Sequence, residues 1–176
     1  MKRIFIILVV LLGVLIYNKN PNEVLIPNTA IRFRVIGNSN SVSDQNTKVL
    51  VRNNLEKEIT NDLKNSKDIE TSRKILSSNI DKYRNNVAKT LISNNIEQTF
   101  SINYGLNYFP EKNYKGVRYK EGNYESLVVT LGSGEGNNWW CVLFPPLCLL
   151  EAEEEYDTEE VEYKSFIKEL IDKYIK

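Results

Sequence analysis

The segment Ile31-Arg32-Phe33-Arg34-Val35-Ile36 alternates apolar and basic side chains. This period of two predicts a half-buried β-strand. The polar residues Gly37-Asn38-Ser39-Asn40 follow, and they favour a turn that ends the strand. Ser41 then stands three residues before Asp44, a spacing typical of a side-chain cap at the start of a helix. This part of the chain therefore predicts a strand that leads directly into a helix.

Two helices are predicted after this strand. An apolar residue recurs every four positions from Val51 to Leu63, which predicts an amphipathic helix that ends near Leu63. A second apolar stripe predicts one continuous helix from about residue 68 to 93. Its members are Ile69, Leu76, Ile80, Tyr83, Val87 and Leu91. Because the connection between the two helices is short, we expect them to pack antiparallel.

Downstream, the apolar period changes from helical to two. The pattern predicts strands over residues 99–108, 117–120, 124–131 and 139–144, and a last helix over 163–175. Short turns between consecutive strands favour antiparallel pairing, and the helices cluster instead of alternating with strands. The expected fold class is α+β, with a mostly antiparallel sheet, a helical pair packed on one face, an N-terminal hydrophobic segment and a C-terminal helix.

The chain divides into four parts by composition. Residues 1–18 hold Lys2 and Arg3 before fourteen apolar residues, which predicts a signal peptide or an N-terminal membrane anchor with the folded body outside the cytoplasm. Residues 19–29 contain two prolines and are interpreted as a linker. Residues 30–150 are expected to form the domain. Residues 151–176 combine an acidic segment, with eight acidic side chains in 151–162, and a C-terminal amphipathic helix.

The composition excludes several functional classes. Among 176 residues there are 23 basic and 23 acidic side chains and no histidine. Equal charge gives no reason to expect a nucleic-acid partner. The missing imidazole excludes Ser-His-Asp triads, Cys-His pairs and His-ligated zinc, and two cysteines are too few for a structural zinc site. We therefore expect no cofactor, no metal and no identifiable catalytic residue.

An enzyme without histidine is left with carboxylates, Lys, Tyr or a thiol without its usual base. One such arrangement is a pair of carboxylates, as in glycoside hydrolases. Spacing selects no two of the seven candidates, which are Glu56, Glu58, Glu97, Glu111, Glu121, Glu125 and Glu135. The loop Gly132-Ser133-Gly134-Glu135-Gly136 lacks the Lys-Ser/Thr and the following helix of a phosphate-binding loop, so we interpret it as a strand–strand connection. Arg32, Arg34 and Arg52 either form a small cationic patch or lie at a solvated edge.

Both tryptophans of the chain lie within an aromatic and proline-rich stretch. Its candidate partner-contact residues are Trp139, Trp140, Phe144, Pro145 and Pro146. In a strand, adjacent side chains point to opposite faces, so one tryptophan belongs in the core and the other at an interface, or both serve core packing. Cys141 and Cys148 flank the Pro-Pro corner, and they form either a disulfide or two buried thiols.

Two segments resemble the stage II sporulation protein R family. The first is Ile31 to Ser41, continuing through Asp44, Gln45 and Lys48 to Val51 and Arg52. The second is Asn138-Trp139-Trp140-Cys141-Val142-Leu143-Phe144-Pro145-Pro146-Leu147-Cys148. The positions that match the first motif include Asn38, Ser41, Asp44, Gln45 and Arg52, whereas Gly37 and Val42 depart from it. We expect Asn38 to shape the turn and Asp44 to shape the helix start.

The resemblance implies a signalling function. Such proteins are made in the forespore and exported into the space between the forespore and mother-cell membranes. There they activate a membrane-embedded aspartic protease of the mother cell, which processes a sigma-factor precursor. The resemblance thus implies a non-enzymatic docking ligand that is exported, or anchored in the cell membrane facing outward. For such a ligand we expect Trp139 or Trp140 to supply the contact, because aromatic anchors dominate protein interfaces. The alternative is an extracytoplasmic cell-envelope hydrolase that uses a carboxylate pair.

Overall fold

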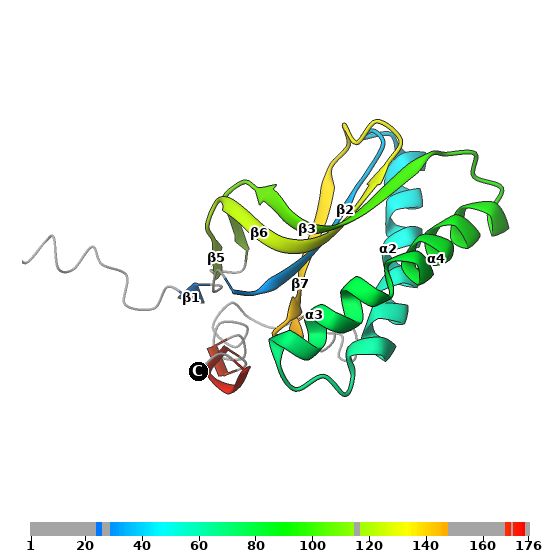
Figure 1. Ribbon diagram of the computed structural model, residues 1–176. Helices are drawn as coiled ribbons and strands as arrows, with labels where there is room; N and C mark the ends of the chain where they lie inside the picture. The colour runs from blue at the N-terminus through cyan, green and yellow to red at the C-terminus, as the bar shows by residue number, and fades with distance from the viewer. Residues whose placement is uncertain (1–23, 26–28, 115–116, 148–167, 170, 175–176) are drawn as a thin grey trace, which may run out of the picture.

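The computed structural model describes residues 24–25, 29–114, 117–147, 168–169 and 171–174. It has an α+β architecture, as predicted, in which helices cover one face of a four-stranded sheet (Figure 1). The strands of this sheet are β2 Ile31–Ile36, β3 Phe100–Phe109, β6 Gly122–Leu131 and β7 Asn138–Phe144. The helices are α2 Val42–Leu63, α3 Ile69–Ser78 and α4 Ile80–Ser93. A smaller sheet contains β1 Val24–Leu25, β4 Lys112–Tyr114 and β5 Val117–Tyr119.

The main sheet has the strand order β3-β6-β2-β7. The pairs β3–β6 and β2–β7 are antiparallel, which confirms the prediction of a mostly antiparallel sheet. The central pair β2–β6 is parallel. Parallel neighbours need a long crossover connection, and here α2, α3 and α4 together with β3, β4 and β5 supply it. The chain returns from β6 to β7 through the short glycine-rich loop.

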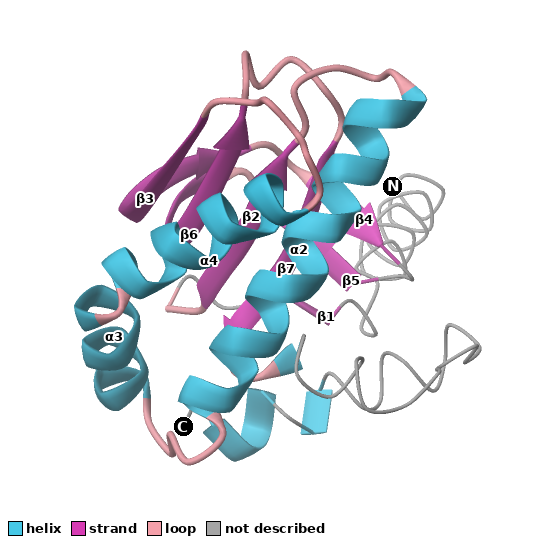
Figure 2. Ribbon diagram, turned by 90° about the vertical axis from the view of Figure 1, so that its right-hand side faces the viewer, coloured by secondary structure: helices cyan, strands magenta, loops and turns pink. Residues whose placement is uncertain are grey.

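The helical face of the sheet contains the apolar core. Strand alternation turns Ile31, Phe33 and Val35 toward the helices, where each of the three is fully buried. Figure 2 looks onto this face, with α2 and α4 in front of the strands. The apolar stripe of α2 packs on it, and Leu55 and Ile59 are also fully buried. Each such side chain contributes about 1.5–3 kcal/mol through burial.

The helix boundaries follow local capping groups. Ser41 caps α2, and its Oγ accepts a hydrogen bond from the Asp44 amide at 3.1 Å, as the sequence predicts. The expectation of one helix over 68–93 was wrong, because the chain breaks at Asn79 into α3 and α4. The Asn79 backbone leaves helical geometry, and its side chain donates to Asp62 of α2 at 3.1 Å. The same apolar stripe fits one straight helix or two that bend around the core.

The face of the main sheet that lies away from the helices is turned toward the small sheet β1-β5-β4. Figure 1 shows β1 and β5 on the side of β2 and β6 that lies away from the helices. Strand alternation turns Arg32 and Arg34 toward this side, and the guanidinium of Arg32 lies 5.8 Å from the ring of Tyr119 in β5. This second layer makes the face opposite the helices partly buried.

The ends of the chain are described only in part. The signal peptide or anchor predicted over 1–18 and the acidic segment over 151–162 lie outside the described residues. Of the predicted last helix, residues 168–169 and 171–174 are helical, and the Tyr174 ring packs edge-on against Phe144 at 5.6 Å. Across the described ranges, helices long and apolar enough for a bilayer are absent.

Candidate functional site

The two segments singled out in the sequence lie side by side in the sheet. β2 pairs antiparallel with β7, in a register that sets Arg34 opposite Trp140 and Val35 opposite Trp139. Sequence positions about a hundred residues apart therefore form one continuous surface. Each strand then offers one set of side chains to the helices and another to the opposite face.

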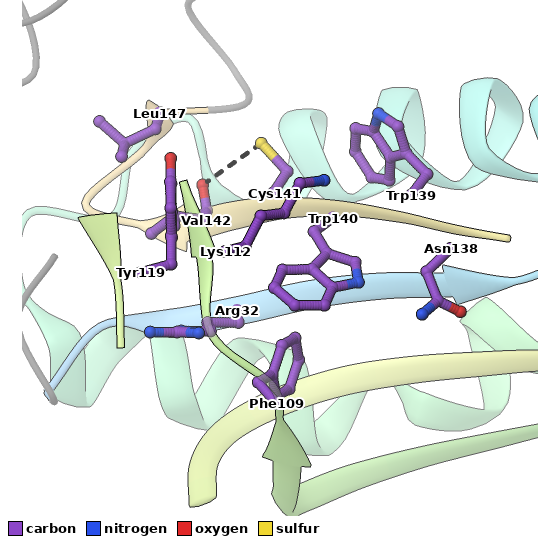
Figure 3. Close-up of a pocket in the computed structure, with 10 residues that line it drawn as sticks. All are labelled: Arg32, Phe109, Lys112, Tyr119, Asn138, Trp139, Trp140, Cys141, Val142 and Leu147. Carbon is purple, nitrogen blue, oxygen red and sulfur yellow. Dashed lines mark hydrogen bonds between the residues drawn. The ribbon is translucent and has the colours of Figure 1, made fainter. Parts of the chain in front are cut away.

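The two tryptophans of β7 point to opposite faces, as strand alternation predicts. The Trp139 ring packs edge-on against Phe33 at 5.4 Å, with the Arg52 guanidinium 5.1 Å from its centroid. The Trp140 ring packs edge-on against Phe109 at 5.2 Å on the other side of the strand (Figure 3). Both residues are half-buried. Each tryptophan thus combines a packed edge with remaining accessible surface.

The expected patch of Arg32, Arg34 and Arg52 is not present. Arg32 and Arg34 lie on the face away from the helices, whereas Arg52 extends from α2 over Trp139 on the helical face. The alternative of a solvated edge is also wrong for Arg32, which is only 2% exposed. The sequence pattern could not show that a second, small sheet covers this side.

A cavity of about 170 Å³ lies next to Trp140 (Figure 3). β2, the end of β3, the small sheet and β7 contribute its walls. Ten of the described residues line it, and they include two cations and four aromatic residues but no carboxylate: Arg32, Phe109, Lys112, Tyr119, Asn138, Trp139, Trp140, Cys141, Val142 and Leu147. The ring of Trp139 itself lies on the other side of β7 (Figure 3). The pocket is therefore cationic and aromatic in character.

Arg32 is unusual among the pocket residues because its charged side chain is buried. Its guanidinium carbon lies 3.4 Å from the centroid of the Tyr124 ring and 5.2 Å from that of Phe109. Its Nε, Nη1 and Nη2 atoms are buried and have no hydrogen-bond partner in the described part of the chain. Burial lowers the pKa of Arg32 below its ordinary value. Stacking on rings contributes about 0.5–2 kcal/mol, whereas burying an ion costs several kcal/mol.

Further donors surround this cation. Arg34 Nε and Trp140 Nε1 are buried without a hydrogen-bond partner among the described residues, although Arg34 Nη1 donates to the Tyr108 carbonyl at 3.3 Å. Lys112 is exposed, and its Nζ lies 5.0 Å from the Trp140 ring. Asn138 Oδ1 is the one buried acceptor of the group without a partner in this part of the structure. The site can accept an anion, because its unsatisfied groups are mainly donors.

The Pro-Pro corner narrows the set of contact residues. Phe144 and Pro145 are buried, and a cis peptide bond joins them, whereas Pro146 is half-buried. A buried side chain offers no surface to a partner, so the contact hypothesis keeps only Trp139, Trp140 and Pro146. Cys141 is disulfide-bonded. Cys148, the other cysteine of the sequence, lies outside the described residues.

The positions that match the first motif bond to one another beside α2. The Asp44 carboxylate accepts from Asn38 Nδ2 at 3.0 Å and from Ser39 Oγ at 2.5 Å. These hydrogen bonds, that of Ser39 first, lower the pKa of Asp44. Gln45 Nε2 donates to the Ser39 carbonyl at 2.7 Å. The bonds fix the turn between β2 and α2, in agreement with the expected roles of Asn38 and Asp44.

The same turn holds the glycine-rich loop between β6 and β7. The Ser133 amide donates to Asn38 Oδ1 at 2.9 Å, and the Gly136 amide donates to the Gly37 carbonyl at 2.8 Å. Gly132 has φ +53°, and a Cβ there would lie 2.1 Å from Asn38 Oδ1. The loop is thus a strand–strand connection that packs on the turn, as interpreted from the sequence.

Several candidate carboxylates of a hydrolase pair are engaged by other side chains. Glu125 accepts from Arg73 and Tyr104, Glu58 pairs with Lys82 at 3.2 Å, and Glu121 accepts from Tyr108 at 3.3 Å. In the described ranges, no group of three or more Cys, Asp or Glu side chains could hold a metal ion. These contacts are the ion pairs and hydrogen bonds that join elements of the fold.

Sequence reasoning missed four residues around the pocket. Phe109, Lys112, Tyr119 and Tyr124 come from β3, the small sheet and β6, and they meet only because these elements fold over β2. One signal was present in the sequence. The strand with Arg32 and Arg34 alternates like a half-exposed strand, but two arginines on one face also suit burial against aromatic rings.

Comparisons with known proteins identify the family of the chain. The family model described as stage II sporulation protein R matches residues 27–154, a range that contains both paired strands. The stage II sporulation protein R of Bacillus subtilis (strain 168) is 37% identical over 158 residues, which cover 89% of this chain and 70% of that protein. No solved structure matches the chain. Because the family model matches most of the chain and the Bacillus subtilis protein is 37% identical to it, the chain belongs to the stage II sporulation protein R family.

Proposed function

We propose that this chain is an exported sporulation signal that activates a membrane-embedded aspartic protease of the mother cell by docking onto it. Membership in the stage II sporulation protein R family carries the proposal, because it supports a role in sporulation. The protease then processes a sigma-factor precursor. The chain itself makes and breaks no covalent bond in this scheme, in keeping with a family that is named for sporulation and for no enzymatic activity.

The proposed location depends on the N-terminal residues. Lys2 and Arg3 before the apolar run orient residues 1–18 so that the folded body lies outside the cytoplasm. The domain then occupies the space between the forespore and mother-cell membranes, or it stays anchored in the cell membrane and faces outward. A reporter fused after residue 30 that stays in the cytoplasm would contradict this location.

Docking explains the surface around β7 better than hydrolysis does. Among the described residues that line the pocket beside Trp140 there is no carboxylate, so these residues offer no acid–base pair for a glycosidic bond. Glu58 and Glu125, two of the candidate carboxylates, are held in ion pairs. Trp139 and Trp140, in contrast, keep accessible ring surface of the kind that dominates protein interfaces.

A docking ligand activates a protease only if it binds the active form better than the idle form. A tenfold shift in that equilibrium requires about 1.4 kcal/mol of differential binding energy. Covering the accessible remainder of one tryptophan ring is sufficient for this amount, since alanine replacement of such anchors costs about 2 kcal/mol or more. The mechanism therefore needs one well-placed aromatic contact and no chemical step.

The test is a deletion in a sporulating host, with cleavage of the sigma-factor precursor as the readout. We expect the deletion to abolish cleavage and the wild-type allele to restore it. Trp139→Ala and Trp140→Ala alleles should restore it poorly, while Ile92→Ala, an exposed position on α4, serves as the matched control. Immunoblots of each variant separate loss of contact from loss of protein. Normal cleavage in the deletion would overturn the proposed function, and normal cleavage with both alanine alleles would overturn the contact.

A further inference from the structure

The buried guanidinium of Arg32 has hydrogen-bonding capacity that the proposed function does not use. The residue is 2% exposed and lines the cavity beside Trp140. All three of its side-chain nitrogens lack a partner in the described chain, and so does Trp140 Nε1. Buried polar groups are nearly always satisfied in folded proteins, and the cluster of unsatisfied donors around one cavity makes this cavity a candidate site for an acceptor that a ligand supplies.

The charge around the cavity points to an anion. Lys112 is a second cation in its wall, and Arg34 points to the same side of β2. Among the described residues, no carboxylate lines the cavity to neutralise them. A ligand with a negative charge would offset the repulsion between these cations.

The size of the cavity and the apolar residues in its wall limit which anions fit it. A cavity of about 170 Å³ admits a small group. The rings of Trp140 and Phe109 and the side chain of Leu147 make much of its wall apolar, which suits an anion attached to an apolar group. The guanidinium fork matches the two oxygens of a carboxylate, and the Nζ atom of Lys112, an exposed residue, lies 5.0 Å from the centroid of the Trp140 ring (Figure 3).

We propose that this cavity is a binding site for a carboxylate-bearing ligand, with its carboxylate on Arg32 and its apolar part against the rings of Trp140 and Phe109. The site does not depend on the signalling role, because it rests on the cavity and its donors alone. The ligand is either a small organic acid or an acidic side chain of a partner polypeptide.

The first test uses benzoate as the probe and the full chain in detergent micelles. The indole N–H signals of the two tryptophans are followed by NMR during titration. We expect a saturable shift of the Trp140 signal, with a smaller shift of Trp139, whose ring lies on the other side of β7. Benzamide has the same shape without the charge, and it should cause no saturable shift. If benzoate causes none either, the proposal is overturned.

Variants of the two cations sharpen the test. Arg32→Met should raise the dissociation constant of benzoate at least tenfold, and Lys112→Gln should raise it severalfold. Lys57→Gln, an exposed change on α2, should leave it unaltered. Lys112 is exposed, so its variant keeps the test decisive if Arg32→Met fails to fold. Equal benzoate affinity in the wild type and in either pocket variant would overturn the site.

Two further probes define the ligand. Inorganic phosphate should bind more weakly than benzoate, because the apolar walls do not solvate a compact dianion, and tighter binding of phosphate would overturn the carboxylate assignment. A short peptide with a central glutamate next to phenylalanine is compared with its glutamine version. Binding of only the glutamate peptide supports a polypeptide as the source of the carboxylate. Binding of benzoate but of neither peptide supports a small organic acid.

Discussion

On its helical face the four-stranded sheet buries apolar side chains, whereas on its other face it buries a charge. Phe33 and Arg32 are adjacent in β2 and are both almost completely buried. Phe33 packs in the core under α2 and against Trp139. Arg32 stacks on Tyr124, and its nitrogens have no hydrogen-bond partner among the described residues. The apolar face stabilises the fold, whereas the other face keeps hydrogen-bond donors that have no partner among the described residues.

The largest effect is expected on the helical face. Leu55→Ala removes a fully buried side chain of α2, and it should lower the free energy of unfolding by about 2–5 kcal/mol because a cavity remains in the core. Denaturant unfolding followed by circular dichroism measures this change. Val49→Ala on the same helix, at a position 42% exposed, is the control and should change stability by less than about 0.5 kcal/mol. Equal effects of the two would mean that α2 does not pack as described.

The opposite face should respond in the other direction. Arg32→Met replaces an unpaired buried cation by an apolar side chain of similar length, so the free energy of unfolding should stay the same or rise, by up to about 4 kcal/mol. Arg34→Met is the control on the same side of β2. It removes the hydrogen bond to the Tyr108 carbonyl and should lower stability by about 1 kcal/mol. A clear loss of stability in Arg32→Met would show that Arg32 has a structural partner.

The turn at the end of β2 holds the glycine-rich loop, and this contact can be tested separately from the two faces of the sheet. Gly132→Ala adds a Cβ at φ +53° and 2.1 Å from Asn38 Oδ1, and it should lower the free energy of unfolding by about 1–3 kcal/mol. In the double variant with Asn38→Ala, the contacts with Oδ1 and Cγ are removed, while the Cβ of residue 38 stays at 3.0 Å and the strain at φ +53° remains. We therefore expect the two losses to be less than additive. Additive losses would contradict the close contact between the loop and the turn.

The smallest effect concerns pH. Hydrogen bonds from Arg73, followed by that from Tyr104, hold the pKa of Glu125 below its ordinary value of 4.5. A carboxyl group with a lowered pKa in the folded state stabilises the protein above its ordinary pKa, and this stabilisation is lost as the pH falls through the lowered pKa. Since the Arg73 side chain is 39% exposed, solvent screens the pair, and we expect about 1 kcal/mol or less.

The measurement compares Glu125→Gln with the wild type by unfolding between pH 7 and pH 3. The stability difference between the two proteins should be largest at neutral pH and should shrink in acid. Glu97→Gln, at an exposed position, is the control and should show no such trend. A difference that grows on acidification would mean that the Glu125 carboxylate does not stabilise the fold through Arg73.

The sequence allowed much of the fold to be predicted. Ser41 and Asp44 marked the start of α2, and the alternation of Ile31 to Ile36 matched β2 residue for residue. These features follow from local rules, in which the signal and the structure lie within a few residues of each other. The break at Asn79 was missed, because it depends on a hydrogen bond to Asp62 in another helix.

The candidate site was predictable only in part. The motif around Trp139 and Trp140 was found from composition, and their opposite orientation followed from strand alternation. The rings that enclose Arg32 could not be found, because Phe109 and Tyr124 belong to β3 and β6. Which side chains share a cavity depends on strand order, and strand order is set by contacts between distant parts of the chain.

By itself, the sequence determined the α+β class of this protein, its family and the absence of imidazole chemistry. Periodicity, capping residues and composition do not depend on contacts between distant parts of the chain, so they can be recognised directly in the sequence. Only the tertiary structure decided that β2 lies between β6 and β7 and that Arg32 is enclosed instead of solvated. The physical reason is that burial of a side chain is a property of everything packed around it, and those neighbours come from four separate strands and the loops between them.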